Sequence, residues 1–419
     1  MIGNDELNVH NHVNSSSGAP PAGLRTWASH ATNTSTMPKE HTNLAFHLLE
    51  WPFRDLVSRP YNPQVLLQLE MSREPLTLPK PQCMDLFNNA TYIQAFFSRV
   101  NIWYACVNPY NWPGYYRTAL SNGFREGPES CIVLLVLALG QASICGSISR
   151  ISLSSDPPGL SYFSSAWSLL PNLMIRNTVL STQCMVLAAA YLFYLVRPLE
   201  AWTVLSSTST KLHLLLSRSG RMPAQERELS ERVYWNALLF ESDLLAELDL
   251  PHSGIVQFEE SVGLPGEFTE IGQYEHIHNS NGNGESNGAL VGRDDLWYFL
   301  AGIALRRLLI RACQLIYGKD SVATTCALEP VVAELDFQLG QWYESLPLPL
   351  QFPYTRGLLT DPVQIVLRLR FFACKTTIFR PYVLTVMDNE QAALNKVVME
   401  NCRKCLDAAV RQLDYTTAQ

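Results

Sequence analysis

The chain has 419 residues, of which 47% are hydrophobic and 16% are charged. A chain of this length and composition can bury a large core, which argues against wholesale disorder. The formal net charge is −7. Because DNA-binding surfaces need clustered Lys and Arg to neutralise phosphates, this balance disfavours a chain that grips DNA by itself.

Residues 1–40 are rich in Ser, Asn, Thr, Pro and Gly. Such a segment cannot bury enough apolar surface to offset the conformational entropy that it would lose on ordering. We therefore predict a disordered tail over 1–40. The N-terminus also lacks a charged segment followed by an apolar one, so we expect no secretory signal.

The longest uninterrupted apolar run covers Cys184 to Val196, thirteen residues. A run of this length is too short to cross a bilayer and is typical of a buried core helix. The ten cysteines are scattered and lie mostly in apolar stretches, where a free thiol behaves as a small hydrophobe. We expect no membrane span and no disulfide framework.

Helical periodicity dominates the chain. Between residues 230 and 248, the apolar residues Val233, Ala237, Phe240 and Leu244 recur at a spacing that places them on one helical face. A similar pattern predicts a second stripe made of Trp297, Ala301, Ala304, Leu308, Ala312 and Leu315. We expect both stripes to face a core.

Charged residues and prolines predict further details of these helices. Glu228 and Arg232 are spaced i,i+4, so we expect an ion pair on the solvated side. Asp361 is placed to cap a helix that has Pro362 in its first turn and ends at the Arg380-Pro381 pair. The last helix is expected from Asp388 to about Leu413.

Strand patterns are almost absent, so we predict an all-α fold, an antiparallel array of about ten helices. A polar segment at 272–292 divides the helical material. We therefore expect a first helical block at 41–271, a loop at 272–292 and a second helical block at 293–419. No repeat of fixed length is visible, so a regular solenoid is not supported.

A set of short segments runs through the chain in a fixed order. The central ones are Tyr162-Phe163, Gln183 before the apolar run, Ala201-Trp202, Arg232-Val233-Tyr234-Trp235, the Glu241/Asp243 pair and a segment ending at Pro251. The flanking ones are HLLEWP (47–52), GPESCIVLLVLALG (127–140), LWYFLAGIALRRL (296–308), QWYESLP (341–347) and FRPY (379–382). This order resembles the fungal-specific transcription factor domain, the middle homology region of zinc binuclear cluster regulators.

The resemblance implies a nuclear regulator of a gene set, often a metabolic or secondary-metabolite biosynthetic cluster. Regulators of this family bind DNA through a six-cysteine module that holds two zinc ions, and their helical region regulates and can sense a ligand. The first cysteine here is Cys83, so the sequence given has no paired thiolates in front of the helical region. We therefore expect a regulator-like protein that acts through protein partners or a dimerising regulator, contacts DNA only indirectly and is compatible with a small-molecule effector. A zinc-cluster segment upstream of this sequence is an alternative.

A second alternative is an all-α biosynthetic enzyme on the same scaffold, a Mg²⁺-dependent cyclase or lyase. Asp243 and Glu247 are spaced i,i+4 and could hold Mg²⁺ together. The same carboxylates could equally form a solvated face or pair with basic residues of a neighbouring helix. We favour the non-enzymatic interpretation and predict no catalytic residues and no cofactor.

The remaining candidate groups have simple structural interpretations. Cys402 and Cys405 form a CxxC pair, but they lie one helical turn apart within a helix, so we expect a structural role rather than a redox or metal site. His276 and His278 lie in the polar loop, where we expect a solvated pair.

The arginines of the second block form a small basic strip made of Arg306, Arg307 and Arg311. We expect this strip to pair with acidic helices rather than with DNA. The chain also has nine Trp, seventeen Tyr and seventeen Phe, enough aromatic surface for a small-molecule pocket between helices. The sequence does not locate such a pocket.

Overall fold

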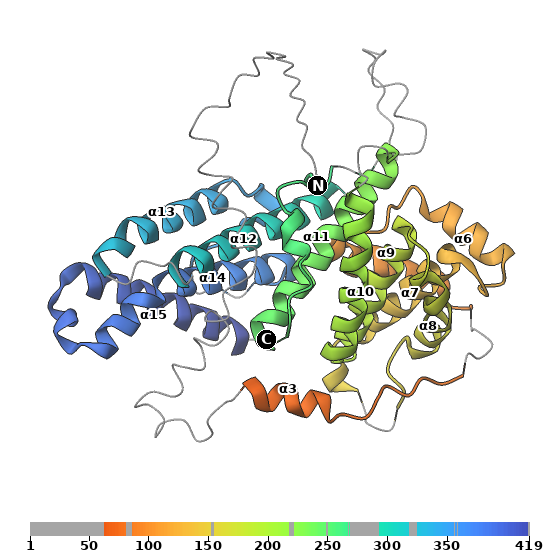
Figure 1. The fold of residues 1–419 in the computed structure, drawn as a ribbon, viewed down its shortest axis with the longest axis horizontal. Helices are drawn as coiled ribbons and strands as arrows, with labels where there is room; N and C mark the ends of the chain where they lie inside the picture. Colours follow the sequence, from red (N-terminus) through yellow and green to blue (C-terminus); the bar gives the residue numbers. More distant parts are fainter. Residues whose placement is uncertain are drawn as a thin grey trace, which may run out of the picture. The chain divides into compact units, whose positions relative to one another are not determined.

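The computed structural model describes residues 63–80, 86–151, 155–217, 222–248, 250–266, 268, 293–317, 325–355, 357 and 359–417. Over these residues the secondary structure is helical and contains no strand, which confirms the all-α prediction (Figure 1). All of them belong to one compact unit, Thr36–Gln419. The predicted tail at 1–40 and the predicted loop at 272–292 lie outside the described residues.

Nine of the described α-helices lie before residue 272. They are α3 (Pro63–Met71), α4 (Asn89–Ala95), α5 (Asn101–Tyr104), α6 (Trp112–Ser121), α7 (Gly127–Cys145), α8 (Leu160–Met174), α9 (Val179–Tyr194), α10 (Pro198–Leu216) and α11 (Ala224–Glu247). A π-helical turn, Phe96–Val100, joins α4 to α5, and short 3₁₀ turns cover Ile148–Arg150 and Ile255–Phe258. Consecutive long helices pack on one another from α7 to α11.

The later helices are α12 (Arg293–Tyr317), α13 (Thr325–Glu344), α14 (Pro362–Asp388) and α15 (Lys396–Thr417). Figure 1 shows them side by side, coloured from cyan to dark blue. Helix α14 packs on α12, α13 and α15, and α12 also packs on α5 and α11. Helix α12 therefore joins the later helices to the earlier ones.

Helix α7 is the central helix of the earlier group and packs on α4, α6, α8 and α9. It is the one described helix that is long and apolar enough to cross a membrane, and 67% of its apolar stretch is buried inside the protein. Four helices cover it, an arrangement that is typical of a core helix. Gly140 permits the close approach of α4, because a Cβ at this position would collide with the backbone carbonyl of Tyr92.

The buried apolar residues form two clusters. The first is built from residues between Phe96 and Ile255, with Phe299 and Ile303 of α12 added. The second is built from α12 to α15 and the turns between them. Helix α5 contacts both clusters. Trp103 packs against the second, where its ring meets the ring of Tyr298 edge to face with 4.7 Å between the centroids, and Tyr104 packs against the first.

The predicted stripe on α12 is partly wrong. Three of its members are buried, namely Ala301, Leu308 and Ala312, and three are exposed, namely Trp297, Ala304 and Leu315. The helix buries two faces, since Tyr298 belongs to the second cluster and its neighbour Phe299 to the first. A helix that is buried on two sides has no single apolar stripe for the sequence period to reveal.

The predicted end of α14 is also wrong. Asp361 caps the helix as predicted, accepting a hydrogen bond from the Val363 amide at 2.9 Å. The helix then continues through Pro381 to Asp388. A proline removes one helical hydrogen bond. Pro381 nevertheless lies inside α14, and packing of the buried residues around it keeps the helix intact. The last helix accordingly starts at Lys396, after a 3₁₀ turn, and not at Asp388.

Candidate functional site

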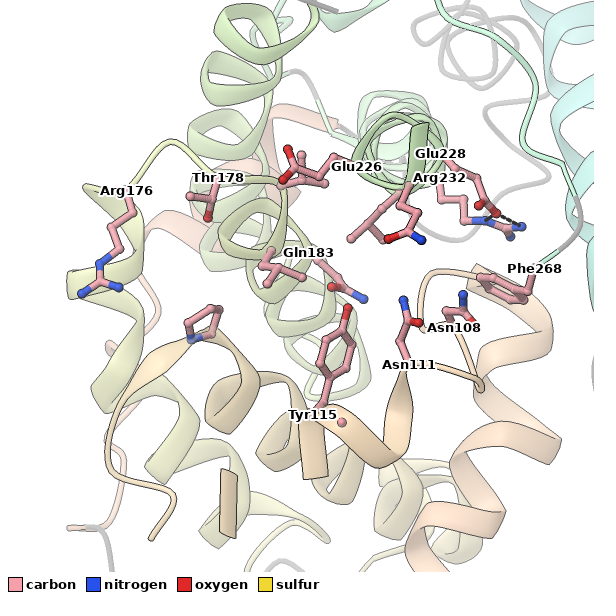
Figure 2. A pocket seen from close by; sticks show the side chains of 16 residues that line it. Asn108, Asn111, Tyr115, Arg176, Thr178, Gln183, Glu226, Glu228, Arg232 and Phe268 are labelled. Carbon is pink, nitrogen blue, oxygen red and sulfur yellow. Dashed lines mark hydrogen bonds and ion pairs between the residues drawn. The ribbon is translucent and has the colours of Figure 1, made fainter. Parts of the chain in front are cut away.

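A cavity of about 490 Å³ lies among the earlier helices, within the range of about 300–1,000 Å³ that is usual for small-molecule sites. Figure 2 shows it from close by. Its walls come from α6, the start of α7, α9, α11 and the loops beside them. The lining residues are Asn108, Asn111, Gly114, Tyr115, Pro128, Arg176, Thr178, Val179, Leu180, Gln183, Gln225, Glu226, Glu228, Leu229, Arg232 and Phe268.

A buried backbone loop, Tyr104–Val107, connects this pocket to the rest of the fold. Four consecutive carbonyl groups of the loop each accept a hydrogen bond from a buried side chain. The pairs are Asn236 Nδ2 to the Tyr104 carbonyl at 2.6 Å, Arg232 Nη1 to Ala105 at 2.8 Å, Gln183 Nε2 to Cys106 at 2.6 Å and Asn101 Nδ2 to Val107 at 3.0 Å. The loop is thus held by side chains from three helices.

The loop needs these donors because it is irregular backbone inside a core. Ala105 has a φ of 43°, in the left-handed region, where the helical hydrogen-bond pattern stops. Ala105, Cys106 and Val107 are fully buried, so water cannot reach their carbonyls. A buried carbonyl without a partner costs about 1–3 kcal/mol, and burial also raises the pKa of the Cys106 thiol to about 12.

Arg232 is the most heavily bonded of the donors. Besides Ala105, its guanidinium donates to the carbonyl of Gly266, contacts Glu228 at 3.0 Å and lies 3.7 Å from the centre of the Phe268 ring. The predicted ion pair with Glu228 is therefore confirmed. Its predicted location is wrong, because Arg232 is only 1% exposed. Burial lowers the pKa of Arg232, and the charge of Glu228 opposes that shift.

Two acceptor atoms at the pocket have no hydrogen-bond partner among the described residues, Gln183 Oε1 and Asn111 Oδ1. Gln183 is fully buried and Asn111 half-buried. Burial raises the pKa of the nearby Tyr115 phenol, and a hydrogen bond with the Asn111 side chain opposes that shift. In Figure 2 the side chains of Asn111, Tyr115 and Gln183 point into the same space between the helices.

The rim of the pocket at the α8–α9 turn is fixed from α10. The Lys211 ammonium donates to the Arg176 carbonyl at 3.0 Å and to Asn177 Oδ1 at 3.1 Å. Thr178 then caps α9 by accepting from the Ser181 amide at 3.2 Å. Lys211 is only 7% exposed, and this burial lowers its pKa. These bonds hold Arg176 and Thr178 at the edge of the pocket.

The two Mg²⁺ candidates lie away from the pocket. The Asp243 carboxylate is half exposed and pairs with Arg306, and Arg370 lies 3.9 Å from its second oxygen. Glu247 lies in the last turn of α11 and is exposed. Over the described residues, no three or more His, Cys, Asp and Glu side chains gather in a way that could hold a metal ion. The structure thus gives Asp243 two guanidinium partners, and the Mg²⁺ site stays a prediction.

Two of the three arginines of the basic strip pair with acidic residues, as expected. Arg306 binds Asp243, and Arg307 binds Glu259 at 2.7 Å. Arg311 instead lies 3.5 Å from the side-chain oxygen of Gln338. The contacts of Arg306 and Arg307 hold α12 against α11 and against the turn that follows α11.

The CxxC pair is buried in α15 against α14. The Cys405 sulfur lies 3.6 Å from the Thr376 carbonyl, and burial raises the pKa of this thiol to about 11. Burial also raises the pKa of Cys402. Thiols in this state pack as small apolar groups. His276 and His278, the other candidate pair, lie outside the described residues.

Comparison with known proteins gives one informative similarity. The chain is 24% identical over 346 residues to the "Putative transcription factor ecdB" of Aspergillus rugulosus. The similarity supports a transcription-factor-like family for this chain. The aligned part covers 76% of this chain and 56% of the relative, so the chain spans little more than half the relative's length. No family model and no solved structure matches the chain, and its assignment to the fungal-specific domain stays a prediction.

The pocket residues were not singled out from the sequence as a site. Their signal is an amide side chain next to or inside an apolar helical stretch, as with Gln183 before the run that starts at Cys184 and Asn236 in the apolar part of α11. An amide in such a place needs a buried partner. The sequence cannot say that the partners of Gln183, Arg232 and Asn236 are neighbouring carbonyls of a single loop.

Proposed function

We propose that this chain is the helical regulatory part of a transcription regulator of a fungal gene set, a metabolic or secondary-metabolite biosynthetic cluster, and that it acts in the nucleus. The similarity to a protein named as a transcription factor over 76% of the chain carries this proposal. In the proposed role the helical domain works through protein partners or a dimerising regulator and contacts DNA only indirectly. The pocket beside the Tyr104–Val107 loop receives a small-molecule effector.

The geometry supports an effector role because the pocket and the interhelical contacts share residues. Gln183 and Arg232 line the pocket and also hold the Cys106 and Ala105 carbonyls. The loop continues from α5, whose Trp103 ring meets Tyr298 of α12 at 4.7 Å. An occupant that moves either pocket side chain therefore disturbs the contact between α5 and α12.

Such coupling needs two packings of comparable free energy. A ligand shifts the balance between them only by the difference in its affinity for each. The packing of α12 is suited to this role because it contributes to both hydrophobic clusters. In the proposed mechanism, pocket occupancy changes how α12 sits between the clusters and hence which surface is offered to partners.

A reporter assay tests the regulatory role. The full chain is fused to a heterologous DNA-binding domain, and the transcription of a reporter that carries the matching site is measured in a fungal host. We expect the fusion to change reporter output in either direction relative to the DNA-binding domain alone, and the untagged chain to enrich in nuclei. An inert fusion together with a chain excluded from nuclei would refute the proposal.

A gel-shift assay tests the indirect DNA contact. The described surface carries arginines that are paired with carboxylates, as at Arg306 and Arg307. We expect the purified chain to show no sequence-specific shift by itself and to enter a complex in the presence of a partner regulator. Tight, sequence-specific binding by the chain alone would contradict this part of the proposal.

A further inference from the structure

We propose that the pocket takes an uncharged, largely apolar small molecule that carries at least one N–H or O–H group, with Gln183 Oε1 and Asn111 Oδ1 as its hydrogen-bond acceptors. Gln183 is then the residue that determines specificity. This inference deepens the effector role proposed above and rests on it for its biological meaning, whereas the binding itself can be measured separately.

The charges of the lining indicate an uncharged occupant. The pocket is lined by four ionisable residues of fixed charge at neutral pH, Arg176, Arg232, Glu226 and Glu228. Two are positive and two are negative, so the lining has no net charge. The innermost of them, Arg232, is already satisfied by Glu228 and by the carbonyls of Ala105 and Gly266. Arg176 and Glu226 are exposed. A ligand charge buried beside Arg232 and Gln183 would therefore find no free counter-charge close by, and its desolvation cost would not be offset.

The orientation of the Gln183 amide indicates that the occupant must donate. Its Nε2 atom donates to the Cys106 carbonyl at 2.6 Å, and only the nitrogen of an amide can make that bond. The oxygen therefore occupies the other position of the amide, where no described group donates to it. A fully buried acceptor of this kind is satisfied when a ligand presents an N–H or O–H group.

A second acceptor lies on the opposite wall, at the start of α6. Asn111 is the residue before α6 and makes no capping hydrogen bond with its side chain. Its Oδ1 atom is buried and has no partner among the described residues. The apolar remainder of the wall, which includes Val179, Leu180 and Leu229, suits the body of the ligand.

A substitution at Gly114 can obstruct the pocket. It lines the cavity, and a Cβ built on it would meet nothing within 4 Å. Gly114→Leu therefore adds an apolar side chain at the wall of the cavity, and its Cβ displaces no neighbour. Gly340 on α13 is a matched control, since a Cβ there also meets nothing within 4 Å and the residue does not line the pocket.

The test uses three fluorescent probes of nearly equal size, and the full purified chain. Hydroxypyrene has an O–H donor, methoxypyrene lacks it, and pyrene carboxylate is an anion at neutral pH. We expect hydroxypyrene to bind about tenfold or more tightly than either of the other two, which corresponds to one buried hydrogen bond. Equal binding of the hydroxy and methoxy probes, or tightest binding of the carboxylate, would overturn the proposal.

Variants assign the binding to this pocket. Gly114→Leu should abolish hydroxypyrene binding, and Gly340→Leu should leave it unchanged. Gln183→Met should remove the preference for the hydroxy probe, and Asn111→Leu, which removes no capping bond, gives the same readout if Gln183→Met fails to fold. Hydroxypyrene binding that survives Gly114→Leu would place the probe elsewhere and refute the assignment.

The two proposals fail in different ways. If the probes bind as predicted but Gly114→Leu leaves reporter output unchanged, the chemistry of the pocket stands and the effector role falls. If the fusion regulates the reporter but no probe shows the donor preference, the regulatory role stands and the proposed ligand class falls.

Discussion

The guanidinium of Arg232 donates a hydrogen bond of 2.8 Å to the carbonyl of Ala105, a residue 127 positions earlier in the chain. This bond joins α11 to a buried left-handed loop, and the same guanidinium binds Glu228 and the carbonyl of Gly266. Three segments that lie far apart in the sequence thus depend on one side chain. It also forms part of the pocket wall.

Replacing Arg232 should strongly destabilise the fold. Arg232→Met leaves the buried Ala105 carbonyl, the Gly266 carbonyl and the Glu228 carboxylate without their donor, so we expect a loss of about 3–5 kcal/mol in the free energy of unfolding. Arg232→Lys keeps the charge but not the planar fork, and its loss should be intermediate. Urea unfolding followed by circular dichroism measures both variants. Arg311→Met, at an exposed arginine, is the control and should change the free energy of unfolding by no more than about 0.5 kcal/mol. Similar losses for Arg232→Met and Arg311→Met would show that the bonds of Arg232 do not stabilise the fold.

The contact between α4 and α7 can be tested at Gly140. Gly140→Ala forces its Cβ into the Tyr92 carbonyl, which cannot move without shifting α4, so we expect a loss of about 1–3 kcal/mol. Gly340→Ala meets open space on a helix and should gain up to about 1 kcal/mol, because alanine favours helix over glycine. Thermal and urea denaturation should therefore show a lower free energy of unfolding for Gly140→Ala and a higher one for Gly340→Ala. A stabilised Gly140→Ala would show that α4 and α7 do not approach so closely.

Asp243→Asn separates the ion-pair role from the Mg²⁺ alternative. The Asp243 side chain is 50% exposed and pairs with Arg306, and exposed pairs contribute about 0–1 kcal/mol. We expect the substitution to lower the free energy of unfolding by less than about 1 kcal/mol. Calorimetric titration of the unsubstituted chain with Mg²⁺ is the companion measurement. Micromolar Mg²⁺ binding that Asp243→Asn and Glu247→Gln both abolish would revive the enzyme alternative.

The stability of the fold should fall in mild acid because of His213. Its ring packs against the ring of Phe258, with 4.6 Å between the centroids. Burial lowers the pKa of His213, while the Gly254 carbonyl and the charge of Glu241 oppose that shift. The unfolded chain therefore takes up a proton at higher pH than the folded chain. By linkage, the free energy of unfolding decreases as the pH falls through the unfolded value of about 6.5.

His213→Gln removes this titration and should flatten that part of the stability profile. The measurement is the midpoint of urea unfolding at a series of pH values between 5.5 and 8, for the variant and the unsubstituted chain. If the two profiles keep the same slope in this range, the acid sensitivity belongs to other groups.

Much of the helical framework follows from the sequence because it depends on local rules. The helical period of α11 correctly placed Val233, Ala237 and Leu244 in the core. The Asp361 cap was equally local, since its oxygen binds an amide two residues on. Errors arose where packing overrides local preference, as at Pro381, which lies inside a helix because its surroundings are buried.

The pocket, in contrast to the helical framework, depends on packing more than on local rules. The i,i+4 spacing of Glu228 and Arg232 predicted their ion pair but placed it in solvent. The sequence contains no trace of the Ala105 and Gly266 carbonyls that draw Arg232 into the core, because those partners are 127 and 34 positions away. Pairings of this range depend on how the helices stack.

The sequence by itself determined that this chain is helical, where several helices begin, and that it resembles a class of transcription regulators. The helical class and the helix starts come from periodicity, capping and composition, which act over a few residues, and the resemblance comes from the order of short segments along the chain. Only the tertiary structure decided that Gln183, Arg232, Asn236 and Asn101 meet at one loop, and that a cavity opens beside it. A buried carbonyl must find a donor wherever the fold provides one, and that choice is made by packing.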